Sequence, residues 1–167
     1  MPDGRPIALA SAMNLRAALP HMLAVVRPDN AGLADLLAQH EIGSVVATRA
    51  AEGMGASLAQ GITAATCASG WLIALADMPY LKRETLLAIA GALDRGAAIA
   101  VPMYRGQRGH PVGFSARFGQ ELARLGGDEG ARSLVRQHAA EVVEIECGDA
   151  GVLADIDTAA DLAKAPR

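Results

Sequence analysis

The stretch WLIALADMP, residues 71–79, decides the fold class because a continuous apolar run ends there in an aspartate and a turn. Such a run suits a β-strand that is covered on both faces, as strands in parallel sheets are. Gly70 precedes the run, and Asp77 and Pro79 follow it. The pattern therefore predicts a buried strand over residues 71–76 with Asp77 at its carboxyl end.

On both sides of this run, helix patterns alternate with short apolar strand patterns. Strands are predicted over residues 21–26, 43–47, 71–76, 97–101, 111–114 and 142–146, with Pro102 ending the fourth. Helices are predicted over residues 7–19, 31–40, 57–65, 84–93, 118–125, 130–138 and from Thr158 onward. This alternation predicts a three-layer α/β fold with a mostly parallel sheet, and the changed rhythm after Pro102 predicts an added antiparallel portion. We predict a single domain over residues 1–167.

Composition excludes several classes of protein. Of the 167 residues 51% are hydrophobic and 20% are charged, which is unlike a disordered chain. The net charge is −3 and the basic residues do not cluster, so we expect no nucleic-acid partner. The longest apolar run is only strand-sized, so we expect no membrane span. Cys67 and Cys147 are isolated, which predicts reduced thiols and a cytoplasmic location.

Ligands of open α/β sheets bind at the carboxyl ends of the strands, which makes Asp77 the first candidate site residue. A carboxylate in a turn held by Pro79 is suited to Mg²⁺, which takes one or two carboxylates together with substrate phosphates. The alternative is an aspartate that only stabilises a turn or caps a helix.

A second candidate is the glycine-rich turn that contains Gly53, Met54, Gly55 and Ser57 and leads into a predicted helix. Glycines allow backbone amides to approach a ligand, and a helix N-terminus favours anions. The alternative is an ordinary helix cap by Ser57.

Two further candidates lie in the second half of the chain. Gly109 and His110 end a polar, cationic loop over residues 104–111, where His110 could donate to an anionic substrate or transfer a proton; the alternative is a solvated hairpin. Asp155 and Asp157 flank an apolar residue, so in an extended segment they face opposite sides. At most one would then share a metal with Asp77, and the other would cap the final helix.

Taken together, five stretches resemble the nucleotidyltransferases that attach a nucleotide to molybdopterin. They are residues 52–58, 76–79, 109–114, 126–132 and 155–162, and they occur in the order of that family. The resemblance is greatest to the branch that transfers CMP to the molybdenum cofactor, with a guanylyl-transferring branch close to it. It implies a Rossmann-like nucleotidyltransferase fold, CTP rather than GTP as the donor, a pterin-phosphate acceptor, and release of pyrophosphate.

The resemblance also implies roles for the candidate residues. Asp77, helped by Asp155 or Asp157, would hold Mg²⁺, and His110 with residues 53–57 would line the acceptor side. A molybdoenzyme client or chaperone would receive the product. The alternatives are a non-catalytic module that binds or carries the cofactor, and a nucleotidyltransferase for another small metabolite.

The sequence departs from the family pattern at its beginning. The family opens with a strand and a glycine-rich loop of the type Leu-Ala-Ala-Gly-x-Ser-x-Arg-Met/Phe-Gly followed by a lysine, and this chain contains no match to it. We expect an amino-truncated form of an active enzyme, or otherwise a degenerate form, and weak nucleotide binding by this chain. Micromolar binding of CTP or GTP in a calorimetric titration would contradict that expectation.

Overall fold

A computed structural model describes residue 1 and residues 3–163. The strands are β1 (Leu23–Val26), β2 (Gly43–Val46), β3 (Gly70–Ile73), β4 (Ile99–Tyr104), β5 (Gln107–Arg108), β6 (Val112–Ser115) and β7 (Val142–Glu146). The α-helices are α1 (Ile7–Ala18), α2 (Ala31–Gln39), α3 (Met54–Ala64), α4 (Arg83–Asp94), α5 (Gly119–Leu122), α6 (Arg132–Gln137) and α7 (Ala159–Leu162). These elements confirm the predicted α/β class.

The strands form two separate sheets. In the smaller sheet β1 and β2 pair in parallel, and in the larger the order is β3-β6-β4-β5 with β7 also beside β4. Strand β7 runs parallel to β4, whereas β6 runs antiparallel to both β3 and β4. The predicted antiparallel portion therefore consists of β6 and the short strand β5.

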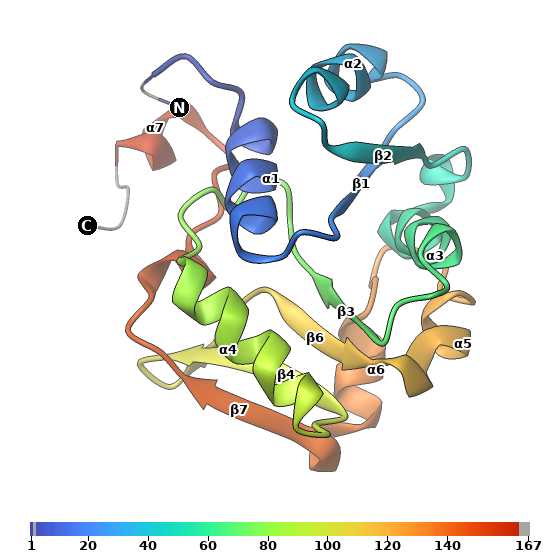
Figure 1. The fold of residues 1–167 in the computed structure, drawn as a ribbon, viewed down its shortest axis with the longest axis vertical. Coiled ribbons are helices and arrows are strands. Elements are labelled where there is room, and N and C mark those ends of the chain that lie inside the picture. The colour runs from blue at the N-terminus through green and yellow to red at the C-terminus, as the bar shows by residue number, and fades with distance from the viewer. Residues whose placement is uncertain (2, 164–167) are drawn as a thin grey trace.

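The larger sheet is covered on both faces (Figure 1). Trp71 and Ile73 of β3 belong to an apolar cluster with Ile62 of α3, whereas Leu72 between them packs with α4. Successive side chains of a strand point to opposite faces, so α3 and α4 lie on opposite sides of β3. At the centre of the sheet Ile99 and Val101 of β4 are fully buried.

The prediction that Pro102 ends its strand is wrong, because β4 continues through Pro102 to Tyr104. Proline lacks an N–H, so it fits only where no ladder bond is needed from that residue. The Pro102 carbonyl accepts from the Gly109 N–H at 2.9 Å, on the side of β4 where β6 pairs only with Ile99 and Ala100. Pro102 therefore faces the interval between β5 and β6, where the ladder needs no N–H donor from this residue.

Other elements differ from the predictions in length. Strand β3 ends at Ile73, so residues 74–76 leave the sheet before Asp77. The two helices predicted between residues 118 and 138 are short, since α5 has 4 residues and α6 has 6. Between residues 3 and 163, no helix is long and apolar enough to span a bilayer.

Candidate active site

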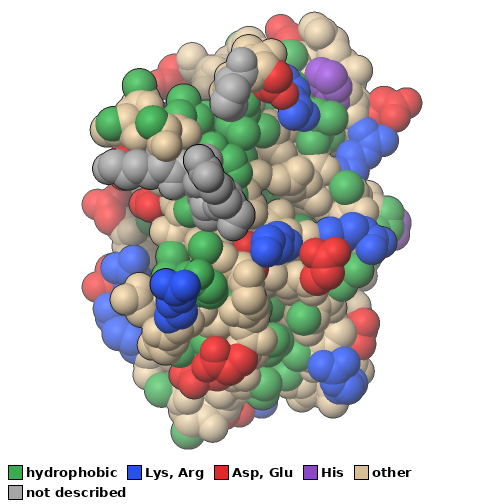
Figure 2. All heavy atoms as spheres, turned by 90° about the vertical axis from the view of Figure 1, so that its left-hand side faces the viewer, with side chains coloured by type: hydrophobic (Ala, Val, Ile, Leu, Met, Phe, Trp, Pro, Cys, Tyr) green, Lys and Arg blue, Asp and Glu red, His purple; other side chains and the backbone are tan. Residues whose placement is uncertain are grey.

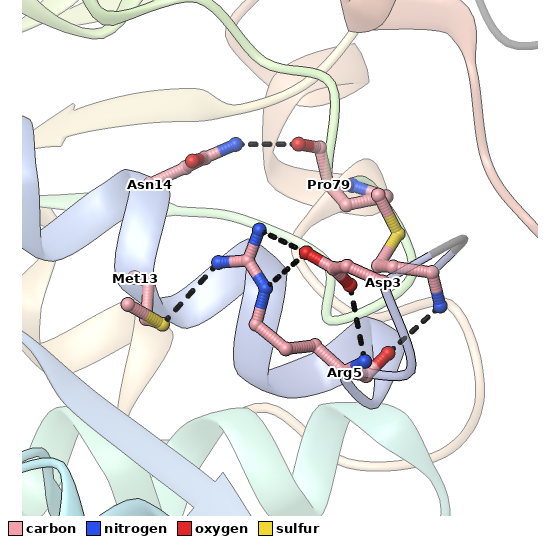
Figure 3. Close-up of polar contacts among 6 residues, drawn as sticks. Asp3, Arg5, Met13, Asn14 and Pro79 are labelled. Atoms are coloured by element: carbon pink, nitrogen blue, oxygen red, sulfur yellow. Dashed lines mark hydrogen bonds and ion pairs between the residues drawn. The ribbon is translucent and has the colours of Figure 1, made fainter.

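The turn that carries Asp77 is held from two sides. Asn14 of α1 donates a side-chain hydrogen bond to the carbonyl oxygen of Pro79 (Figure 3). From the other side, the N–H of Ile156 donates to the Asp77 carbonyl oxygen at 3.0 Å. The first helix and the carboxyl-terminal segment therefore hold the backbone of the turn that carries Asp77.

The start of α1 is itself anchored next to this turn. Arg5 donates to the Asp3 carboxylate and to the sulfur of Met13, and the amino group of Met1 donates to the Arg5 carbonyl oxygen at 2.7 Å (Figure 3). These contacts are exposed and contribute little stability. They fold residues 3–5 back onto α1.

The carboxylate of Asp77 is only partly satisfied. Its Oδ1 atom is buried and has no hydrogen-bond partner in the described structure. Burial raises the pKa of Asp77, and the negative charges of Asp155 and Asp157 raise that pKa further. A buried acceptor without a donor costs free energy, which makes it a marker of a site that awaits a ligand.

His110 lies near the same carboxylate, since the charge of each residue influences the pKa of the other. Its backbone N–H donates to the Val152 carbonyl at 2.9 Å, and its ring Nδ1 is buried without a partner. Burial lowers the pKa of His110, and the positive charge of Arg132 lowers it further, whereas Asp77 opposes the shift. The imidazole is therefore neutral at pH 7, with a ring nitrogen available to a ligand.

The acidic pair lies beside Asp77 but does not complete a metal cage. Asp155 and Asp157 are exposed on either side of the buried Ile156, and both affect the pKa of Asp77. In residues 3–163, no group of three or more His, Cys, Asp or Glu side chains has the geometry to hold a metal ion. Any metal here would need ligands from substrate or water in addition.

The final helix is not capped by either residue of this pair. The N–H and Oγ1 of Thr158 donate to Oδ2 of Asp161 at 2.9 and 2.6 Å, which forms a capping box at α7. The prediction that Asp155 or Asp157 caps the helix is therefore wrong. Both carboxylates remain exposed.

The glycine-rich turn forms a second part of the candidate site. A hollow of about 480 Å³ is lined by Arg27, Ala50, Ala51, Gly53, Met54, Ser57 and Asp128. Gly53 precedes α3 with φ 114°, and a Cβ there would lie 2.4 Å from the Gly127 carbonyl. The Gly55 N–H donates to that carbonyl at 2.7 Å. Two glycine-rich segments thus pack backbone against backbone and form one wall of the hollow.

Ser57 does not cap α3, which begins three residues before it. Its hydroxyl donates back to the Gly53 carbonyl at 3.4 Å from inside the helix. The alternative of an ordinary serine cap is therefore wrong, and Ser57 lines the hollow.

Two further candidates have structural explanations. Gly109 is buried, and a Cβ there would lie 2.3 Å from the Val152 carbonyl oxygen, so this close packing requires glycine. Pro79 is buried and accepts the bond from Asn14. Residues 104–108 form the β4–β5 hairpin with positive φ at Arg105 and Gly106, as the solvated-hairpin alternative expects, whereas His110 continues inward. Ligand contacts of Gly109 and Pro79 remain predictions.

Three charged residues near the site were not selected from the sequence. Arg27 follows β1 and lines the hollow with Asp128, and Arg132 at the start of α6 acts on His110. Arg27 directly follows the predicted strand at residues 21–26, as Asp77 follows the predicted strand at residues 71–76. The rule that ligands bind at the carboxyl ends of strands therefore selects Arg27 as well. Asp128 and Arg132 lie within the stretch 126–132 that carries the family resemblance.

A model of the MobA-like NTP transferase domain matches residues 1–142. The chain belongs to this family. This confirms the resemblance to the molybdenum cofactor nucleotidyltransferases, and the activity of the MobA-like family is that of a nucleotidyltransferase.

Individual relatives agree with the family. Purine catabolism protein PucB of Bacillus subtilis is 32% identical over 163 residues, covering 91% of this chain and 77% of that protein. The manganese complex of Rv0371c from Mycobacterium tuberculosis is 25% identical with a TM-score of 0.76, covering 95% of this chain and 84% of the other. A nucleotidyl transferase from Methanothermobacter thermautotrophicus, 19% identical with a TM-score of 0.80 and coverage of 97% and 79%, shows the shared fold.

On the face shown in Figure 2, Lys and Arg side chains alternate with Asp, Glu and apolar ones rather than merging into a basic surface. Nucleic-acid binding that is independent of sequence depends on a continuous basic surface.

Proposed function

We propose that this MobA-like protein transfers CMP from CTP to the phosphate of a molybdopterin-type acceptor in the cytoplasm. An oxygen of the acceptor phosphate attacks the α-phosphorus, the bond to the bridging oxygen breaks, and pyrophosphate leaves. The observation that carries the proposal is the unpartnered Oδ1 of Asp77, surrounded by His110, Asp155 and Asp157.

These residues fit a divalent cation such as Mg²⁺. An orphaned carboxylate oxygen with one or two neighbouring carboxylates matches the usual protein share of a magnesium site, in which substrate phosphates and water supply the other ligands. Asp77 with Asp155 or Asp157 would hold the ion. When bound, the ion neutralises negative charge on the reacting phosphates. The solved structure of Rv0371c with manganese supports a divalent metal in this family.

The chain's own side chains would orient the two anionic substrates. His110 is neutral at pH 7, so its ring can donate one hydrogen bond to a phosphate oxygen without holding a buried charge. Arg132 adds positive charge near His110, and Arg27 adds positive charge to the lining of the hollow. We assign residues 53–57 and the hollow they line to the acceptor. Catalysis would rest on positioning and electrostatic stabilisation.

The test is pyrophosphate release with Mg²⁺, molybdopterin and a large excess of CTP, because nucleotide binding by this chain is expected to be weak. Asp77→Asn keeps the shape of the side chain and removes its charge, and we expect turnover to fall by roughly 10²-fold or more. Asp35→Asn changes an exposed aspartate on α2 and serves as the matched control, with unchanged turnover. Near-normal turnover by Asp77→Asn would refute the assignment, and GTP used in preference to CTP would correct the donor.

A second candidate function is a non-catalytic module that binds or carries the pterin cofactor and passes it to a molybdoenzyme. The lining of the hollow at Gly53 and Asp128 does not include Asp77, so an acceptor could bind there without any transfer reaction. Saturable binding of molybdopterin with no pyrophosphate release under the same conditions would favour this function over the enzyme.

A further inference from the structure

His138 lies in a cluster of charged side chains outside the candidate active site. It directly follows α6, and its Nδ1 atom lies 2.9 Å from Oε1 of Glu141 in the short helix η3 (Ala139–Glu141). On the other side of the ring, Nε2 lies 3.5 Å from Oε2 of Glu121 in α5. One imidazole therefore lies between carboxylates that come from two different elements. We call these three residues the His138 cluster.

A neutral imidazole cannot bond to both carboxylates. It carries a single N–H, so one ring nitrogen donates and the other presents a lone pair. With the proton on Nδ1 the ring donates to Glu141, and Nε2 is then a buried atom without a hydrogen-bond partner in the described structure. In the other tautomer Glu141 would lose its donor. Only the protonated ring, which has two N–H groups, can donate to both carboxylates at once.

Arg117 is a further charged group next to the cluster, and it is already paired. Its guanidinium binds Oε2 of Glu141, and its Cζ atom lies 4.7 Å from the ring centroid of Phe118. With a neutral His138, two carboxylates and one guanidinium leave the His138 cluster and Arg117 with a net charge of −1. Protonation of His138 brings this sum to zero, so the surrounding charges favour the protonated ring.

Burial distinguishes His138 from an ordinary surface ion pair. Its side chain is 24% exposed, and its ring packs edge-to-face on Phe118 with the two centroids 5.0 Å apart. Phe118 itself is buried in the core of the larger sheet. Solvent and side-chain freedom weaken exposed ion pairs, whereas a ring held against the core is screened less and has less freedom to lose. Protonation of His138 should therefore have a measurable effect on the fold.

The His138 cluster joins the two ends of one segment, residues 123–131. The segment begins after α5, which carries Glu121, and ends at α6, which His138 follows. In its middle the Gly127 carbonyl accepts from the Gly55 N–H of α3 at 2.7 Å, where the two glycine-rich segments form one wall of the hollow. A hydrogen bond between His138 and Glu121 therefore restrains both ends of the segment that forms this wall.

We propose that His138 acts as a pH-sensitive switch for this wall of the hollow. At acid pH the protonated ring donates to both Glu121 and Glu141, which ties α5 to η3 and holds residues 123–131 against α3. At alkaline pH the ring loses a proton and releases Glu121. Histidine is the side chain that ordinarily changes its charge between about pH 5 and 8, so the switch works near neutral pH.

The switch stabilises the folded protein at acid pH. The second N–H of the protonated ring finds the Glu121 carboxylate at a fixed position only in the folded state, so folding favours uptake of the proton. The stabilising contribution of His138 is therefore present at acid pH and is lost as the pH rises. His110 has the opposite dependence, because burial lowers its pKa. Comparing a His138 variant with the wild type at each pH separates the two histidines, since His110 is unchanged.

The first test compares the Tm of the wild type and His138→Gln at about pH 5.5 and about pH 7.5, across the range in which histidine titrates. Glutamine can donate to one carboxylate but cannot gain a charge. We expect a lower Tm for the variant at both pH values, because packing on Phe118 is lost, and a further loss of about 3 °C at the acid pH. His21→Gln replaces an exposed histidine before β1 and should show no such difference. An equal loss at both pH values would overturn the proposal.

The second test changes the carboxylate that only the protonated ring can reach. Glu121→Gln keeps the size of the side chain and removes its charge, so we expect most of the extra stability at acid pH to disappear. The double variant with His138→Gln should lose no more Tm at acid pH than His138→Gln alone, because both changes break the same contact. Glu144→Gln, an exposed position on β7, is the matched control. Additive losses in the double variant would contradict the switch.

The third measurement reports on the wall itself. The Gly55 N–H donates to the Gly127 carbonyl, so its protection from hydrogen exchange, measured by NMR, depends on how firmly residues 123–131 are held. The Ala47 N–H, which donates to Val26 in the smaller sheet, is the reference. From alkaline to acid pH we expect the protection of Gly55 relative to Ala47 to rise about threefold in the wild type and not in His138→Gln. An unchanged ratio in the wild type would refute the link between His138 and the wall, even with a pH-dependent Tm.

Discussion

The turn at Asp77 and the turn at Asp149 each carry a carboxylate with buried atoms, but only one of the two is satisfied. The carboxylate of Asp149 is 1% exposed and accepts from Lys82 N, Thr85 Oγ1 and Gly151 N at 2.8, 2.8 and 2.9 Å. By contrast, Asp77 has a buried oxygen with no donor and two acidic neighbours. A carboxylate whose buried oxygens are all bonded stabilises the fold, whereas a buried oxygen that is left unbonded is available to a ligand.

The largest effect on stability is expected at Asp149. Replacement by alanine leaves the donors on Lys82, Thr85 and Gly151 without their acceptor, so the free energy of unfolding should fall by about 3 kcal/mol. Urea unfolding measures the loss. Asp149→Asn retains one acceptor oxygen and should lose less. A loss under 1 kcal/mol for Asp149→Ala would remove the contrast between the two turns.

Asparagine at position 77 should change the stability in the opposite direction to the substitutions at Asp149. Because burial and the acidic neighbours raise its folded-state pKa, the ionised carboxylate destabilises the folded protein at pH 7. Asp77→Asn should therefore increase Tm at pH 7, on the order of 2 °C. The advantage should shrink as the pH falls through the folded-state pKa toward the ordinary aspartate value of 3.8, because Asp77 then becomes neutral. A lower Tm for Asp77→Asn at pH 7 would show that the carboxylate is structural.

The smallest effect concerns His110, the neighbour that distinguishes the Asp77 turn. Burial lowers the pKa of His110 and the positive charge of Arg132 lowers it further, so Arg132→Gln should raise that pKa. NMR titration of the ring protons measures it, and Arg136→Gln, one turn further along α6, is the control. An unchanged pKa of His110 would show that Arg132 does not act on this residue. Because the folded-state pKa of His110 lies below the ordinary value of 6.5, the stability of the wild-type protein should decline as the pH falls from 6.5 toward that folded-state pKa.

Local patterns in the sequence predicted most elements and the residues at the strand ends. The apolar run at residues 71–76 indicated a buried strand, and the following aspartate indicated the site. Pro102 shows the limit of such reasoning, because whether a proline ends a strand depends on which side lacks a partner. The helix cap at Thr158 shows it as well, because Asp161, and neither Asp155 nor Asp157, supplies the acceptor.

The arrangement of the site was beyond the sequence for a related reason. Asn14 and Pro79 are 65 residues apart, and a hydrogen bond between them fixes the Asp77 turn. The packing of Gly53 and Gly55 against Gly127 likewise joins two segments whose patterns were each weak. Arg27 and Arg132 become candidates only because the fold places Arg27 in the lining of the hollow and Arg132 near His110.

The sequence by itself determined the class of fold, the apolar strands and the chemical identity of the candidate residues, because periodicity and residue type act locally. Only the tertiary structure decided that Asp77 keeps an unpaired oxygen while Asp149 does not, and that β1 stays partly exposed while β4 is buried. Hydrogen-bond satisfaction depends on which distant groups the chain brings together. A strand as apolar as β1 is therefore buried or left exposed by its neighbours and not by its own composition.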